Sequence, residues 1–297
     1  MDNILFRGIY SATFSIYDEN LNVKKESVDK LVRYNLKNGI DGFYVGGNTG
    51  ECTVLPNRTR KQMLETVKES AGGQGKIIAH VGAGHMDDVM DLIGHANEVG
   101  VDAIASLPPS LTAYYKPDEI IEYYRQIASI AKAPVLAYVT PVLTCDVMWF
   151  AGQIMDIENV VGIKLTIADY YLFEKIKLIK DGNINILNGP DESMLSGLVM
   201  GADGAIGTTY NLMPATACKI YSSFLKNDMA QALDQQHKLN RLIDILLGSN
   251  IAKWKSVLTV LDIDPGYTVD PARMPSESEV REVIALLEKA GCTKEMV

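Results

Sequence analysis

The stretch DAIASLPPSLTAYYKPDEIIEYYRQIASIAKAPVLAY, residues 102–138, decides the fold because it contains two strands and the helix between them. Its two ends, 102–106 and 134–138, are short apolar runs of strand length. The segment between them, 117–131, places one set of apolar residues on one helical face: Ile120, Ile121, Tyr124, Ile127 and Ala128. Two strands joined by a helical crossover lie parallel in one sheet, so the stretch predicts a β-α-β unit.

The same alternation of short apolar runs and amphipathic segments continues along the chain. The predicted strands are Ile4–Thr13, Gly42–Val45, Lys76–Val81, Asp102–Ser106, Pro134–Tyr138, Val160–Leu165, Ile184–Leu187 and Gly204–Ile206. Eight such units satisfy the closure of a (β/α)8 TIM barrel, which is an α/β fold. The main alternative is an open, doubly wound sheet, but the run His80–His85 lacks the third glycine of the dinucleotide-binding fingerprint.

The strand pattern stops at about Asn227, and the rest of the chain is predicted to be helical. Helical spacing covers three segments: Met229–Leu247, Ile251–Leu261 and Ser276–Lys289. A loop that contains proline and glycine, Asp264–Pro275, separates the last two. We therefore predict a catalytic barrel over residues 1–227 and a helical C-terminal extension over 228–297 that packs on it.

Composition argues against several classes of partner. The 297 residues include 28 Lys and Arg against 37 Asp and Glu, and no basic stripe suits a nucleic acid. No apolar run approaches the ~20 residues of a membrane span, and the first ten residues do not resemble a signal peptide. Four widely spaced cysteines without a CxxC pair favour free thiols over a zinc site. We expect a cytoplasmic protein that contacts neither membrane nor nucleic acid and holds no metal.

Lys164 is the strongest candidate for chemistry, because it stands near the end of the apolar run Val160-Val161-Gly162-Ile163-Lys164-Leu165-Thr166. In a barrel, the active-site groups lie at the carboxyl ends of the strands. A lysine that points inward from such a strand loses hydration, which favours the neutral amine that attacks ketones. The alternative is an exposed lysine at a strand edge, the usual place for this residue.

Two further candidates follow other predicted strands. Tyr138 ends the strand before the one that carries Lys164, where a tyrosine serves as a general acid and base or packs in the core. The loop Gly46-Gly47-Asn48-Thr49-Gly50-Glu51 lets backbone amides approach a carboxylate or phosphate, or it is a plain glycine-rich turn.

Polar groups also follow the last two predicted strands. In Asn188-Gly189-Pro190-Asp191-Glu192, the adjacent carboxylates suit several sugar hydroxyls, or Asp191 caps the next helix. Residues Gly204–Asn211 close the eighth strand, where barrels often bind anions. The four histidines show no metal-ligand spacing, and a structural role is expected for each.

Together these motifs resemble the N-acetylneuraminate lyase/dihydrodipicolinate synthase family, and the resemblance covers most of the chain. The matching motifs are Gly46–Glu51, Tyr138 with Pro141, Gly162–Thr166, Gly201–Gly204 and Gly207–Asn211. Within the family, the run Asn188–Glu192 resembles the branch that cleaves N-acetylneuraminate, in which paired acids hold hydroxyls of the sugar tail.

The resemblance implies a class I, Schiff-base aldolase that converts N-acetylneuraminate reversibly to N-acetylmannosamine and pyruvate without a cofactor. Lys164 would form the Schiff base and Tyr138 would donate and accept the proton. Tyr115 would reach a neighbouring active site, which implies a homotetramer. The remaining residues implied by the resemblance bind the pyruvate carboxylate (Asn48, Thr49) or the sugar (Thr166, Gly189, Asp191, Glu192, Thr208).

Three positions depart from the family pattern or leave a choice open. Asn48 stands where the family usually has Ser or Thr, and Val139 stands where it usually has Asn. The loop Leu107–Lys116 carries extra residues, so Tyr114 competes with Tyr115 for the inter-subunit role. Two other functions stay open: an aldolase for another 2-keto-3-deoxy sugar acid, and a catalytically silent homologue that binds a keto acid.

Overall fold

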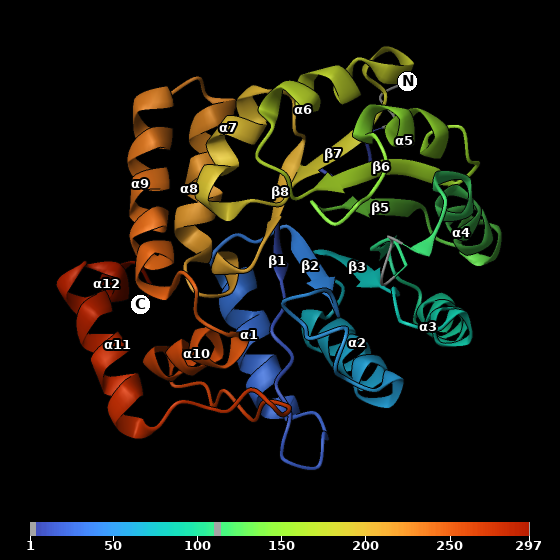
Figure 1. Ribbon diagram of the computed structural model, residues 1–297. Coiled ribbons are helices and arrows are strands. Elements are labelled where there is room, and N and C mark those ends of the chain that lie inside the picture. Colours follow the sequence, from blue (N-terminus) through green and yellow to red (C-terminus); the bar gives the residue numbers. More distant parts are fainter. Residues whose placement is uncertain (1–3, 110–113, 297) are drawn as a thin grey trace.

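Eight parallel strands form a closed barrel in the computed structural model, which describes residues 4–109 and 114–296 (Figure 1). The strands are β1 Gly8–Ala12, β2 Gly42–Val45, β3 Lys76–His80, β4 Ala103–Ser106, β5 Val135–Val139, β6 Val160–Leu165, β7 Asn185–Asn188 and β8 Gly204–Gly207. Each strand pairs with the next one along the chain, and β1 closes the ring against β8, with Ser11 beside Gly207. The predicted TIM barrel is therefore confirmed.

Helices surround the barrel and connect successive strands (Figure 1). They are α1 Lys25–Lys37, α2 Asn57–Ala71, α3 Met86–Val99, α4 Pro117–Ile130, α5 Val147–Ile154, α6 Tyr170–Lys177, α7 Met194–Val199 and α8 Pro214–Leu225. Proline begins α4 and α8, where the missing backbone N–H costs no hydrogen bond. Within the described residues, no helix is both long and apolar enough to span a membrane.

Strand periodicity sorts the side chains between two cores. Alternate residues of a strand point to opposite faces, so Ile163 and Leu165 of β6 pack outward in the core between barrel and helices. Leu136 and Tyr138 of β5 point inward and join a second core that fills the barrel. Lys164 lies between two outward residues of β6 and therefore also points into the barrel.

The C-terminal helices pack against one side of the barrel, next to α1 and α8 (Figure 1). They are α9 Met229–Leu246, α10 Ile251–Ser256, α11 Glu277–Lys289 and α12 Cys292–Met296. Ser276 caps α11 by accepting a hydrogen bond from the Glu279 N–H, while the Glu279 carboxylate accepts one from the Ser276 N–H.

Most predicted strands differ by one residue at one or both ends, and three segments differ more from the sequence prediction. The first strand covers Gly8–Ala12 rather than Ile4–Thr13, because the residues before it run below the barrel and Phe6 joins the inner core. The predicted helix Ile251–Leu261 is α10 followed by a 3₁₀ turn over Val257–Leu261, which ends at Asp262 in the left-handed conformation. The short helix α12 was not predicted, because it is little more than one turn long.

Candidate active site

The register between β5 and β6 places Tyr138 directly beside Lys164. Both side chains are buried, with exposed fractions of 4% and 6%. The Lys164 Nζ lies 4.1 Å from the centroid of the Tyr138 ring. The interpretation of Lys164 as an exposed lysine at a strand edge is therefore wrong, and the two strongest candidates of the sequence form one cluster.

Two aromatic side chains that the sequence did not single out complete the wall around this lysine. The Lys164 Nζ lies 4.6 Å from the centroid of the Tyr44 ring, and Tyr44 meets Tyr138 edge to face at 6.2 Å. The His80 ring stacks edge to face against Tyr138 at 6.5 Å. Electron-rich ring faces attract a positive charge, so this wall suits a protonated imine at Lys164.

Burial determines the protonation states of Tyr44 and His80. Burial raises the pKa of Tyr44 well above its usual value, which keeps its hydroxyl protonated. Burial, with the nearby charges of Arg60 and Lys164, lowers the pKa of His80 well below its usual value, so the ring is neutral. His80 Nε2 accepts a hydrogen bond from the Leu107 N–H at 3.1 Å, which fits the structural role expected for it.

The loop after β2 meets the loop after β8 above the barrel. Thr49 and Thr208 share a hydrogen bond between their hydroxyl oxygens at 2.6 Å, although the two residues are 159 positions apart. Asn48 is exposed beside Thr49, and its Oδ1 accepts a hydrogen bond from the Cys52 thiol at 3.5 Å. Asn48 and Thr49, which are expected to bind the carboxylate of the keto acid, therefore lie at the carboxyl ends of the strands.

Thr166 and Gly189 follow β6 and β7 and touch each other. The Thr166 hydroxyl donates a hydrogen bond to the Tyr138 hydroxyl oxygen at 3.4 Å. A Cβ atom added to Gly189 would lie 1.9 Å from Thr166 Oγ1, so only glycine fits at this position. Thr166 thus connects the predicted proton-transfer residue to the loop that carries Asp191.

Asp191 bridges two loops rather than capping a helix. Its Oδ2 accepts hydrogen bonds from the backbone N–H and the hydroxyl of Thr209, both at 2.8 Å. The helix-cap interpretation of Asp191 is therefore wrong. Burial raises the pKa of this carboxyl group to about 6, although the two bonds from Thr209 act in the opposite direction. Glu192 is exposed, and its carbonyl oxygen accepts a hydrogen bond from Asn240 Nδ2 at 2.9 Å.

Tyr115 stands apart from this cluster in the single chain. Its side chain is 43% exposed and that of Tyr114 is 81% exposed. Part of their loop, residues 110–113, lies outside the described residues. Neither tyrosine is among the described residues that line the cavity above Tyr138, so one chain does not test their predicted role in a neighbouring subunit.

A cavity of about 1060 Å³ opens above the cluster. Its lining includes Tyr138, Thr166, Asn48 and Cys52, together with residues of the loops after β3, β4 and β5. Ligand sites in this fold lie at this end of the barrel, and the volume exceeds that of a nine-carbon sugar acid. The arrangement can therefore hold a keto acid with its reacting carbon near Lys164.

A barrel with a buried lysine and tyrosine side by side where β5 and β6 end has the architecture of a carbon–carbon lyase that reacts through the lysine. The model of the dihydrodipicolinate synthetase family matches residues 5–290. The chain belongs to this family.

Relatives and solved structures of similar length agree with this assignment. The chain is 34% identical over 286 residues to an N-acetylneuraminate lyase of Clostridium perfringens, covering 94% of this chain and 96% of that one. It is 35% identical over 265 residues to an N-acetylneuraminate lyase of Citrobacter koseri, covering 86% and 87%. The sialic acid aldolase structure of Ruminococcus gnavus superimposes with a TM-score of 0.89 at 29% identity, covering 98% and 99%.

Proposed function

We propose that this protein is a class I aldolase that cleaves N-acetylneuraminate reversibly to N-acetylmannosamine and pyruvate. The observation that carries the proposal is Lys164, buried in the barrel with its Nζ 4.1 Å from the Tyr138 ring centroid. The names of the relatives from Clostridium perfringens and Citrobacter koseri support the same substrate. The Asp191-Glu192 pair supplies acceptors for a polyhydroxylated tail.

The proposed reaction begins when the Lys164 amine attacks the C2 ketone of the open-chain sugar acid and water leaves. The resulting protonated imine withdraws electrons from the C3–C4 bond. Tyr138, assisted by the substrate carboxylate, takes the proton of the C4 hydroxyl. The C3–C4 electron pair then moves into an enamine, and the C4 fragment leaves as an aldehyde. Protonation of the enamine at C3 and hydrolysis of the imine release pyruvate and restore the lysine.

In this proposal the surrounding residues bind the substrate or position the reacting groups. Asn48 and Thr49 bind the carboxylate of the keto acid, and Asn48 donates through its amide because it lacks the hydroxyl usual at this position. Thr208 holds Thr49 in place through their shared hydrogen bond and contacts the sugar. Thr166 orients the Tyr138 hydroxyl through its own hydrogen bond. Gly189 lets the loop after β7 pack directly against Thr166, because a side chain at this position would collide with the Thr166 hydroxyl.

A steady-state assay with two compounds, together with borohydride trapping of pyruvate, tests the proposal. We expect cleavage of N-acetylneuraminate with kcat/KM far above that for a 2-keto-3-deoxygluconate. The opposite preference would make a 2-keto-3-deoxy sugar acid the substrate and leave the proposed Schiff-base reaction unchanged. Failure to cleave either compound, combined with failure to trap pyruvate by borohydride, would indicate the catalytically silent alternative.

Glu192→Gln is expected to lower kcat/KM for N-acetylneuraminate by roughly ten- to a hundred-fold, since a hydrogen bond to a charged group contributes ~1.5–3 kcal/mol. Glutamine keeps the shape but removes the charge, and the Glu192 side chain is exposed. Imine formation with pyruvate should be unchanged, because pyruvate has no tail.

Kinetics with a shorter 2-keto-3-deoxy acid provide the control for Glu192→Gln. Glu158→Gln, at an exposed position between α5 and β6, is the matched variant. Equal losses for both substrates would mean that Glu192 has no part in choosing the sugar.

We further propose a homotetramer in which Tyr115 reaches the active site of a neighbouring subunit. The exposure of Tyr114 and Tyr115 in the single chain supports this arrangement. Analytical ultracentrifugation at micromolar concentration should give a mass of about four chains of 32.6 kDa. A monomer would contradict the proposal.

From the sequence we also propose that the protein is cytoplasmic. We propose in addition that the chain divides into a catalytic barrel, residues 1–227, and a helical extension, residues 228–297.

A further inference from the structure

A buried ion pair joins the C-terminal extension to the loop that carries Asn48 and Thr49. Lys255 of α10 is fully buried, and its Nζ donates a hydrogen bond to Glu51 Oε1 at 3.0 Å. Glu51 is the last residue of the loop Gly46–Glu51 and is 5% exposed. The pair therefore links two parts of the chain that are 204 residues apart.

Each member of this pair has further partners. The Tyr17 hydroxyl donates a hydrogen bond to Glu51 Oε2, so both carboxylate oxygens are occupied. Lys255 Nζ also donates to the Tyr267 carbonyl at 2.5 Å and lies 4.3 Å from the centroid of the Tyr17 ring. A buried polar network that is satisfied in this way holds its members in one geometry.

The backbone of the loop depends on this anchor. Glu51 has a φ of 61°, a left-handed conformation that a residue with a side chain adopts only when its surroundings impose it. The Glu51 N–H donates to the Asn48 carbonyl at 2.9 Å, which closes the turn. The Ser15 hydroxyl donates to the Gly50 carbonyl at 2.9 Å. The loop is thus held by the β1–α1 segment and by the extension.

Stability alone is a poor explanation for such a pair. Removing two charges from water costs energy that their attraction often fails to recover, and apolar residues of similar volume are frequently as stable. A directional pair does fix where a backbone segment lies. Here that segment is the turn in which Asn48 lines the cavity and Thr49 shares a hydrogen bond with Thr208.

We propose that Tyr17, Glu51 and Lys255 are positioning residues that hold the Asn48–Thr49 turn in the geometry that binds the substrate carboxylate. This inference rests on the proposed function. It gives the C-terminal extension a part in catalysis, because Lys255 enters the network from α10 while the reacting residues belong to the barrel.

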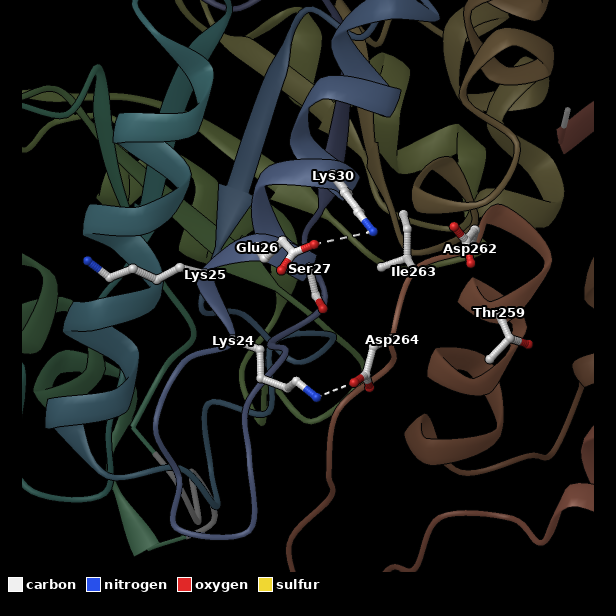
Figure 2. Close-up of a pocket in the computed structure, with 9 residues that line it drawn as sticks. All are labelled: Lys24, Lys25, Glu26, Ser27, Lys30, Thr259, Asp262, Ile263 and Asp264. Carbon is white, nitrogen blue, oxygen red and sulfur yellow. Dashed lines mark hydrogen bonds and ion pairs between the residues drawn. The ribbon is translucent and has the colours of Figure 1, made fainter.

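An exposed ion pair nearby provides the matched control. Lys24 and Asp264 also join the β1–α1 segment to the chain after the Val257–Leu261 turn, and Figure 2 shows them pointing toward each other. Their side chains are 34% and 55% exposed, and they line an open hollow of about 630 Å³. This pair makes a similar connection but does not touch the Gly46–Glu51 loop.

The test compares three variants of the full chain: Lys255→Met, the double variant Glu51→Gln with Lys255→Met, and Lys24→Met. Pyruvate is trapped with borohydride at increasing concentration, and the half-saturating concentration and the melting temperature are measured for each. Lys255→Met should raise the half-saturating concentration about tenfold or more, because small misplacements of a binding group cost up to ~10²-fold. It should also lower the melting temperature, because Glu51 loses its buried partner.

The double variant separates positioning from stability. It leaves no unpaired buried charge, so we expect the melting temperature to recover while pyruvate still saturates only at the raised concentration. Lys24→Met should match the wild type in trapping. If Lys255→Met does not fold, the double variant and Tyr17→Phe, which removes one hydrogen bond to Glu51, give the same comparison.

Two results would overturn the inference, and they differ from each other. If the variants that fold trap pyruvate at the wild-type half-saturating concentration, or if affinity recovers together with stability, the network serves stability alone. If the wild type itself does not trap pyruvate at Lys164, the proposed function and this inference fall together.

Discussion

Replacing Lys164 by Ala is expected to abolish cleavage, with a loss of kcat of at least ~10⁴-fold, as is typical when a covalent nucleophile is removed. The Lys164 amine lies between two aromatic rings of the barrel interior, with Nζ 4.1 Å from the Tyr138 ring centroid and 4.6 Å from that of Tyr44. The fold should survive, because these ring contacts contribute only ~0.5–2 kcal/mol each.

Borohydride reduction in the presence of pyruvate tests directly whether Lys164 forms the imine. Mass spectrometry of the reduced protein should find the pyruvate adduct on Lys164 in the wild type and none in Lys164→Ala. Lys164→Arg is the matched control, since arginine keeps the positive charge but does not form an imine. An adduct on another lysine, or an active arginine variant, would contradict the assignment.

Tyr138→Phe should lower kcat by ~10²–10⁴-fold and change KM much less, because the lost hydroxyl transfers a proton in the transition state rather than binding the substrate. Phenylalanine keeps the ring next to Lys164, so the aromatic wall remains intact. Steady-state kinetics with N-acetylneuraminate measure both constants.

Tyr10→Phe is the matched control for Tyr138→Phe. Tyr10 is also buried inside the barrel, but its hydroxyl donates to the Arg7 carbonyl at 3.1 Å, at the opposite end of the strands. Its replacement should leave kcat unchanged. A Tyr138→Phe variant whose kcat stays within a few-fold of the wild type would show that Tyr138 acts through packing alone.

The fold could be predicted because its signals are local. The alternation of strand and helix periods in 102–138 needs only neighbouring residues to be recognised, and the same holds for Val160–Leu165. Boundaries that depend on distant contacts were less accurate. The segment before β1 was predicted as strand, although Phe6 instead packs in the inner core that fills the barrel.

Part of the candidate site could also be predicted, since strand order places Tyr138 and Lys164 on neighbouring strands of any eight-stranded barrel. The residues that arrive from elsewhere in the ring were missed. Tyr44 and His80 belong to β2 and β3, and their positions over Lys164 and Tyr138 follow only from the closure of the barrel. An isolated tyrosine or histidine in a sequence predicts only a side chain that packs in the core or has a structural role.

The sequence by itself determined the order of the strands and the loops that follow them, because strand and helix periods are short-range patterns. It left open whether Lys164 points into the barrel or lies exposed at a strand edge, and the burial of Lys164 in the folded barrel decided this. Only the tertiary structure decided that Asp191 binds Thr209 rather than capping a helix, and that Lys255 reaches Glu51. Both contacts join loops or helices far apart in the chain. Their partners are chosen by how barrel and extension pack, which no local pattern of residues records.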